Sequence, residues 1–154
     1  MTSIVSPRRG SGHKAHQNSD EMIQQKLISV PSAEILTLYS SPIEVVRAQG
    51  TKKVIEFLGA VCFLDHGGTD YAAGGVFNFM LGSTPGTNVV SDDVAAADFI
   101  NSAADAYRVV QPLSADTALV ANTALYVANE TAVHTTGDGE LKILLSYRIV
   151  DFNF

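Results

Sequence analysis

The sequence predicts a mainly β protein: a β-sandwich, with the jelly roll as one candidate topology, one short helix in a long connection and an extended N-terminal arm. From Leu27 onward, short apolar segments are separated by Pro, Gly, Asn, Asp and Ser, as in proteins built from many short strands. Within residues 140–152, apolar side chains stand at every second position, Leu141, Ile143, Leu145, Tyr147 and Ile149, and alternate with Glu140, Lys142, Ser146 and Arg148. The length of 154 residues, 46% of them hydrophobic and 17% charged, fits one folded domain. We therefore expect an arm over residues 1–26 and a sandwich body over residues 27–154.

The arm is predicted from its composition. Residues 1–26 are rich in Ser, Gly, His, Gln and Asn and carry four Lys and Arg against two acids, whereas residues 27–154 carry six against fourteen, a net charge of −8. A segment so poor in apolar residues cannot offset its own ordering entropy, but it can become ordered on a partner. An acidic body repels phosphate backbones, so we expect no nucleic-acid partner for it. The residues expected to anchor the arm to a partner are Ile4, Val5, Arg8, Arg9, Lys14 and Ile23.

The first half of the body predicts short strands. The segments "LISV" (27–30) and "AEILTLY" (33–39) are the first two candidates. Residues 52–66, "KKVIEFLGAVCFLDH", are apolar at both parities apart from Glu56, which is typical of a strand that is covered on both faces. A further strand is expected in "GGVFNFML" (74–81), joined to it by the flexible connection "DHGGTDYAAG".

The second half predicts the helix and the clearest strand. Residues 91–107, "SDDVAAADFINSAADAY", begin with a possible N-cap serine and two aspartates and continue with alanines, so we expect the helix there. Residues 117–128, "TALVANTALYVA", have better strand than helix character toward their end. The run "ELKILLSYRIVDF" (140–152) predicts a strand with one wet face, introduced by the turn "TTGDG".

Residues 57–75, "FLGAVCFLDHGGTDYAAGG", raise the question of catalysis. The only cysteine, Cys62, has apolar neighbours, which favours a buried thiol over a nucleophile. Asp65, His66 and Asp70 have no metal-site spacing, and the glycines lack the lysine and following helix of a phosphate loop. We therefore predict a hairpin tip whose exposed loop residues are Asp65, His66, Asp70 and Tyr71, with no catalytic residue, no metal and no cofactor. Non-enzymatic binding or assembly is the expected function.

A resemblance supports this class of function. The run "VPSAEILTLYSSPIEVVRAQGTKKVIEFLGAVCFLDHGGTDYAAGG", followed by "VSDDVAAADFINSAADAYRVVQPLSADTALVANTALYVAN" and "TTGDGELKILLSYRIVDF", resembles small structural proteins of tailed bacteriophages and prophages. Some proteins of this kind are capsid decoration, or cement, proteins that bind the outside of a shell. The resemblance covers residues 27–154 and brings no catalytic or ligand residues. It implies a location in the virion at the capsid surface after assembly in the host cytoplasm, with the major capsid protein or neighbouring virion subunits as partners.

Two expectations about assembly remain open at this point. The resemblance implies a homo-oligomer, with the trimer as the expected number, and no apolar run is long enough for a membrane-spanning helix, so no membrane partner is expected. The alternative is a receptor- or glycan-binding β-sandwich of a phage fibre or tail. That function would use the 65–75 loop, and Tyr71 in particular, for ligand contact.

Overall fold

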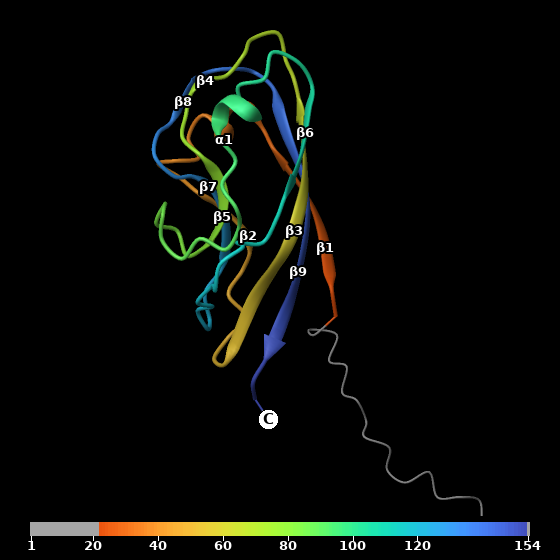
Figure 1. The fold of residues 1–154 in the computed structure, drawn as a ribbon, viewed down its shortest axis with the longest axis vertical. Helices are drawn as coiled ribbons and strands as arrows, with labels where there is room; N and C mark the ends of the chain where they lie inside the picture. The colour runs from red at the N-terminus through yellow and green to blue at the C-terminus, as the bar shows by residue number, and fades with distance from the viewer. Residues whose placement is uncertain (1–21, 154) are drawn as a thin grey trace, which may run out of the picture.

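A computed structural model describes residues 22–153, and these form a β-sandwich of two main layers (Figure 1). The first layer is a four-stranded antiparallel sheet in the order β1-β9-β3-β6. Its strands are β1 (Gln24–Val30), β3 (Lys53–Asp65), β6 (Ala106–Val110) and β9 (Glu140–Asp151). The long strands β3 and β9 lie at its centre. The first strand of the body, β1, pairs with the last, β9.

The second layer completes a jelly-roll strand order. It contains β2 (Ile43–Val46), β7 (Leu125–Asn129) and β5 (Phe77–Leu81), in the order β2-β7-β5, and residues 89–94 bridge the free side of β5. The pairs β1 with β9, β2 with β7, and β3 with β6 are nested like a rolled-up hairpin, as in a jelly roll. The predicted fold class, a mainly β sandwich, is therefore confirmed.

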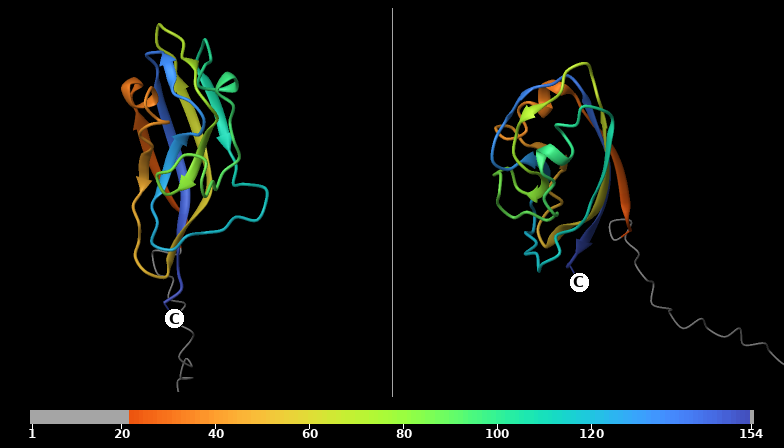
Figure 2. Two further views of the ribbon diagram at one scale, coloured as in Figure 1. Left: turned by 90° about the vertical axis from the view of Figure 1, so that its left-hand side faces the viewer. Right: turned by 45° about the horizontal axis from the view of Figure 1, so that its top comes forward.

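A small ribbon closes one end of the sandwich. It pairs β4 (Ala72–Ala73) with β8 (His134–Thr136), and both lie in connections between the two layers (Figure 2). The 65–75 stretch is not a hairpin tip, because β3 pairs with β6 and β9 whereas β5 pairs with β7. It is a connection that carries the chain from one sheet to the other.

The core between the layers is built from the inward side chains of both sheets. The rings of Phe57 and Phe79 stack with centroids 4.8 Å apart, and Phe77 meets Phe79 edge to face at 5.7 Å. The alternation expected within residues 140–152 is confirmed, because its alternate apolar residues are buried: Leu141, Ile143, Leu145, Tyr147 and Ile149. Leu144, which lies between two of them, faces outward. Each such side chain contributes about 1.5–3 kcal/mol by leaving water.

Strand β3 contains a bulge that the apolar run conceals. Its register to β9 shifts between Phe57 and Gly59, so Leu58 is the extra residue. Ile55 and Phe57 before the bulge and Cys62 after it all point inward, although they have different parities. The expectation that both faces of this strand are covered is therefore wrong. Odd-numbered residues point into the core before the bulge and even-numbered residues do so after it, while the residues between them face outward.

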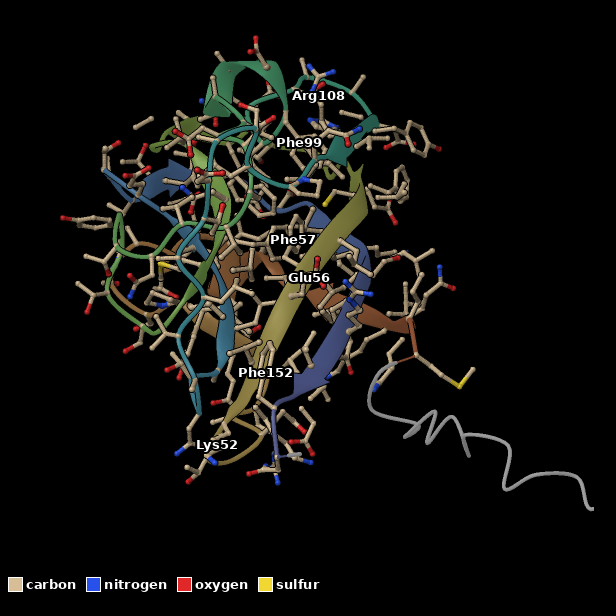
Figure 3. The ribbon with its side chains drawn as sticks, turned by 60° about the horizontal axis from the view of Figure 1, so that its bottom comes forward. Lys52, Glu56, Phe57, Phe99, Arg108 and Phe152 are labelled. Atoms are coloured by element: carbon tan, nitrogen blue, oxygen red, sulfur yellow. The ribbon has the colours of Figure 1, made fainter. Side chains whose placement is uncertain are left out.

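The helical expectations need correction as well. Residues 91–107 contain only the 3-10 turn η2 (Ala96–Asp98), and their last two residues begin β6. The only α-helix of the described chain is the single turn α1 (Ser32–Ile35), in the segment expected to form the second strand. Figure 3 shows Phe99, which follows η2, at the same end of the body as Arg108 and far from Lys52 and Phe152.

The boundary between arm and body lies earlier than expected. Strand β1 begins at Gln24, whose side-chain oxygen accepts a hydrogen bond from the Tyr147 hydroxyl at 3.1 Å. Lys26 donates to the Val45 carbonyl at 2.8 Å, which ties β1 to the second layer. Residues 24–26, assigned to the arm from composition, therefore belong to the sheet.

Candidate functional site

The polar side chains of the 65–75 connection are used in local structure. His66 Nε2 lies 2.7 Å from Asp70 Oδ1, and the His66 backbone N–H donates to Asp105 at 2.9 Å. Asp65 forms an ion pair with Lys142 at 3.3 Å. Within residues 22–153, no group of three or more His, Cys, Asp and Glu side chains could hold a metal ion. These residues hold the connection in shape. Asp65 and Asp70 are exposed as expected, whereas His66, also expected to be exposed, is only partly so because its ring lies against Asp70.

Tyr71 corrects the expectation of an exposed loop residue. Its side chain is only 3% exposed, and its hydroxyl donates to the Gly139 carbonyl at 2.6 Å. A side chain at Gly137 would meet the Tyr71 ring at 2.2 Å, so the glycine leaves room for the ring. Burial, together with the nearby charge of Asp138, raises the pKa of Tyr71 to about 12. Tyr71 fastens the 65–75 connection to the segment before β9 and is not available to a ligand.

His134 is a buried titratable group that the sequence did not single out. It is 3% exposed and lies edge to face against Tyr71, with ring centroids 5.6 Å apart. Its ring packs where a side chain at Gly74 would be, and neither ring nitrogen has a protein partner of hydrogen-bond geometry. Burial lowers the pKa of His134, and the nearby carbonyls of Ala72 and Ala73 only partly oppose this effect. A neutral histidine between Gly74 and Tyr71 therefore packs the ribbon end.

Cys62 has the environment of a core residue. It is fully buried on the inner side of β3, and burial raises the pKa of its thiol to about 12. A nucleophilic thiol requires the opposite shift, because the thiolate is the reactive form. The interpretation of Cys62 as a packing residue agrees with this geometry.

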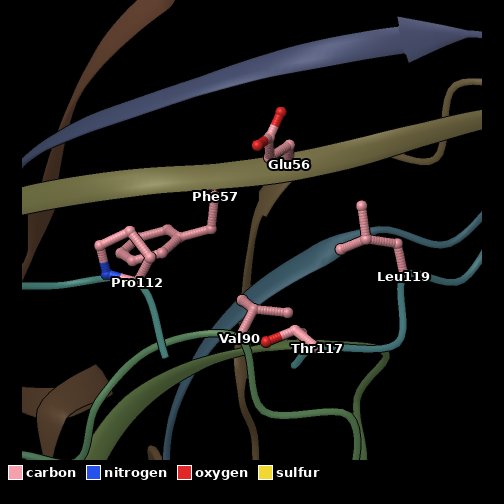
Figure 4. Close-up of a pocket in the computed structure, with 6 residues that line it drawn as sticks. All are labelled: Glu56, Phe57, Val90, Pro112, Thr117 and Leu119. Carbon is pink, nitrogen blue, oxygen red and sulfur yellow. The ribbon is translucent and has the colours of Figure 1, made fainter. Parts of the chain in front are cut away.

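An apolar hollow of about 180 Å³ lies beside β3 (Figure 4). Phe57 points into it with its ring beside Pro112, while Glu56 points the other way and pairs with Arg148. The only hydroxyl in its lining, that of Thr117, donates to the Ala115 carbonyl. The hollow offers mainly apolar contact, because Glu56, the titratable residue of its lining, turns its carboxylate away toward Arg148. Its lining residues are Glu56, Phe57, Val90, Pro112, Thr117 and Leu119.

The most unusual surface is the side of the β1-β9-β3-β6 sheet that faces away from the second layer, which we call the outer face. One row of four apolar side chains, directly opposite one another in the strand register, crosses all four strands. Single exposed apolar residues are normal, but a contiguous row on a small domain usually marks a contact site. We call this set the central row: Leu27 is 73% exposed, Leu144 39%, Val61 49% and Val109 62%.

The next row of the outer face adds aromatic surface. Phe63 and Tyr107 lie on β3 and β6, with stacked rings 4.7 Å apart, and Tyr107 is 68% exposed. Lys142 lies over the Phe63 ring at 5.9 Å. On the other side of the central row, Gly59 has no side chain, and a hollow of about 190 Å³ lies there between Gln25 and Gln111.

The charges at the ends of the outer face are paired within the chain. Lys142 pairs with Asp65 and Arg148 with Glu56, while Glu140 accepts a hydrogen bond from a neighbouring serine. The face thus has an apolar centre and a polar, internally compensated rim, which is the anatomy of protein interfaces. It is the described surface best suited to contact with another protein.

The anchors expected in the arm can be placed only in part. Ile23 lies just before β1 and is exposed. Ile4, Val5, Arg8, Arg9 and Lys14 lie outside the described residues.

Comparison of the chain with protein-family models, with curated proteins and with solved structures finds no match. In the part of the chain that the structure describes, no helix combines the length and apolar character needed to cross a membrane.

Proposed function

We propose that the protein is a non-enzymatic virion structural protein of a tailed bacteriophage, of the capsid decoration class, and that the outer face is one of its contact surfaces. The observation that carries the proposal is the central row, Leu27, Leu144, Val61 and Val109, exposed together across one sheet. Burial of such a row against another protein gains about 25 cal/mol for each Å² of apolar surface removed from water. The resemblance to phage structural proteins supplies the setting.

The partners that fit this surface are protein subunits: the major capsid protein or neighbouring virion subunits. The rim charges compensate one another, so the face does not attract a strongly charged polymer such as nucleic acid. The acidic body repels such a polymer as well, with six Lys and Arg against fourteen Asp and Glu in residues 27–154. In this proposal the protein attaches to the shell through the arm and through the part of the outer face that no neighbouring subunit covers.

The alternative function, glycan or receptor binding through the 65–75 connection, loses its aromatic contact residue. Tyr71 is buried and bonded to Gly139, so this connection presents polar side chains without an aromatic platform. No described feature favours this alternative.

The experiment is to count the protein in purified particles and then to measure binding. Decoration predicts tens to hundreds of copies per particle, whereas a handful of copies would point to a tail-tip adhesin, and absence would contradict a virion role. Particles that lack the protein are then titrated with wild type, with Val61→Lys and with Val133→Lys. Val133 is 38% exposed but lies between β7 and β8, outside the outer face. We expect Val61→Lys to weaken binding at least about tenfold and the Val133 control to bind like wild type.

A further inference from the structure

We propose that the outer face binds the outer face of a second copy of this chain, with a two-fold axis along the central row. This inference rests on the proposed function, because it names the subunit that covers the face. The rows on either side of the central row complement each other when one copy is turned over onto the other.

The geometry follows from the register. A two-fold axis along the central row places each of its residues opposite the same residue of the other copy. Each copy also has a row two residues along the strands on either side of the central row, about 6.6 Å from the axis. The rotation places the row on one side of one copy opposite the row on the other side of the second copy. On β3 these rows contain Phe63 and Gly59. On β6 the first row contains Tyr107, and Gln111 lies just beyond the end of that strand, beside the hollow over Gly59.

The shapes of these two rows fit together. The Phe63 and Tyr107 rings form the raised side of the outer face, while the hollow of about 190 Å³ over Gly59 forms its lowered side. Under the two-fold axis, Phe63 of each copy lies over Gly59 of the other. Two packed sheets lie about 10 Å apart with interdigitating side chains, so a ring facing a glycine is the arrangement that fills this space.

The charges near the axis also allow the approach. On β9, Lys142 lies over Ser146 of the second copy, so no like charges meet in the rows next to the centre. One row farther out, Glu140 faces Arg148 and Asp65 faces Glu56, one favourable and one unfavourable approach. The central three rows therefore decide the specificity of the contact.

The expected area gives a weak dimer. The contact would be about 19 Å wide, since it spans four strands about 4.8 Å apart, and about 27 Å long in the strand direction. These dimensions give a buried area of about 500 Å² per copy, or about 1,000 Å² in total. This is close to the lower limit of about 1,000 Å² for a specific interface. We expect weak association, with a dissociation constant of the order of micromolar, because the area is at this limit. Pairing would also bring two arms together on a shell lattice, which raises avidity.

The test uses purified full-length protein without particles. Sedimentation from low to several hundred micromolar measures wild type, Val109→Lys, Val109→Asp and an equimolar mixture of the two variants. Because Val109 faces itself across the axis, each variant alone places like charges together, and we expect the dissociation constant to rise at least about tenfold. The mixture should recover dimers, since Lys then faces Asp. Val133→Lys serves as the control and should dimerise like wild type.

Each other outcome overturns the proposal. A wild type that is monomeric over the whole range contradicts the two-fold contact. So does a wild type that forms the trimers expected from the resemblance, since the two-fold axis joins two copies only. Dimers that persist in both Val109 variants place the contact elsewhere, and variants that dissociate but are not rescued by mixing exclude this axis. If wild type is monomeric and deletion of residues 1–21 then allows dimers, the arm of the chain itself is the occupant. If wild type is monomeric and Val61→Lys still weakens particle binding, a shell subunit covers the face and the proposed function stands without the dimer.

Discussion

Tyr71→Phe removes one oxygen atom and tests how the 65–75 connection is held. In the wild type, the hydroxyl donates to the Gly139 carbonyl at 2.6 Å from a side chain that is 3% exposed. A net hydrogen bond contributes about 0.5–1.5 kcal/mol, and leaving a buried carbonyl without its donor costs about 1–3 kcal/mol. We expect the free energy of unfolding to fall by about 1–3 kcal/mol and the melting temperature to fall by about 3–10 °C.

The assay is urea unfolding followed by circular dichroism, with Tyr39→Phe as the matched control. Tyr39 is 40% exposed, so the same substitution there should change the free energy of unfolding by less than about 0.5 kcal/mol. Equal effects of the two substitutions would refute the assignment of Tyr71 as a buried fastener. They would also reopen the glycan-binding alternative, which needs this ring at the surface.

Alkaline pH provides a second measurement on the same pair. Tyr71 has its pKa raised from 10.0 to about 12, so its neutral form is favoured in the folded state. The corresponding stability is complete below pH 10 and is lost as the pH rises from 10 toward 12, because the unfolded state releases this proton first. Wild type should therefore lose more stability than Tyr71→Phe in that range. Cys62, whose pKa is also raised, is present in both proteins and cancels in the difference.

Three further predictions concern the core, the ribbon end and the arm. Cys62→Ser should lower the free energy of unfolding by about 1–3 kcal/mol without changing dimer dissociation, and thiol reagents should label Cys62 only on unfolding, as mass spectrometry can check. Burial lowers the pKa of His134, so the unfolded state takes up the proton first and the free energy of unfolding should fall as the pH drops below 6.5. His134→Gln should make the free energy of unfolding less dependent on pH in this range. An unchanged pH profile would contradict this prediction. Deletion of residues 1–21 leaves β1 complete and should yield a folded body by circular dichroism that binds particles more weakly than the full chain, the difference shrinking as salt rises; equal binding would place attachment on the body.

The sequence predicts best those strands that bury one face and expose the other. Strand β9 is recognised because apolar residues recur at every second position from Leu141 to Ile149, and one buried face fixes that parity even though Leu144 interrupts the polar set. In β3 both parities are apolar, so the sequence could not show that Leu58 is an extra residue or that Val61 faces outward. The candidate interaction surface was missed for this reason: its row becomes visible only when four strands are placed in register.

The helix expected at residues 91–107 fails because tertiary contacts take its backbone groups. Phe77 and Val94 exchange both N–H···O bonds at 2.8 and 2.9 Å, and Ser91 Oγ accepts from the Phe79 N–H at 2.9 Å. The serine, aspartates and alanines are good helix formers near an N-terminus, but strand β5 needs a partner at its free side. Likewise, the burial of Tyr71 depends on Gly137, a residue 66 positions away whose missing side chain no local pattern reveals.

The bulge in β3 connects stability with assembly. Gly59 has a φ of +140°, which side-chain-bearing residues rarely adopt, and the same missing side chain leaves the hollow of the outer face. Beyond it, Val61 and Cys62 are neighbours in sequence but lie on opposite sides of the sheet, one exposed and one fully buried. We therefore expect a substitution at Cys62 to change the unfolding equilibrium and a substitution at Val61 to change the proposed association. If both residues only filled a core, substitutions at Val61 and Cys62 would both lower the free energy of unfolding and leave association unchanged. If the outer face is kept apolar for a partner, only Cys62 substitutions lower the free energy of unfolding and only Val61 substitutions weaken association. Measuring both quantities for both residues therefore distinguishes the two explanations.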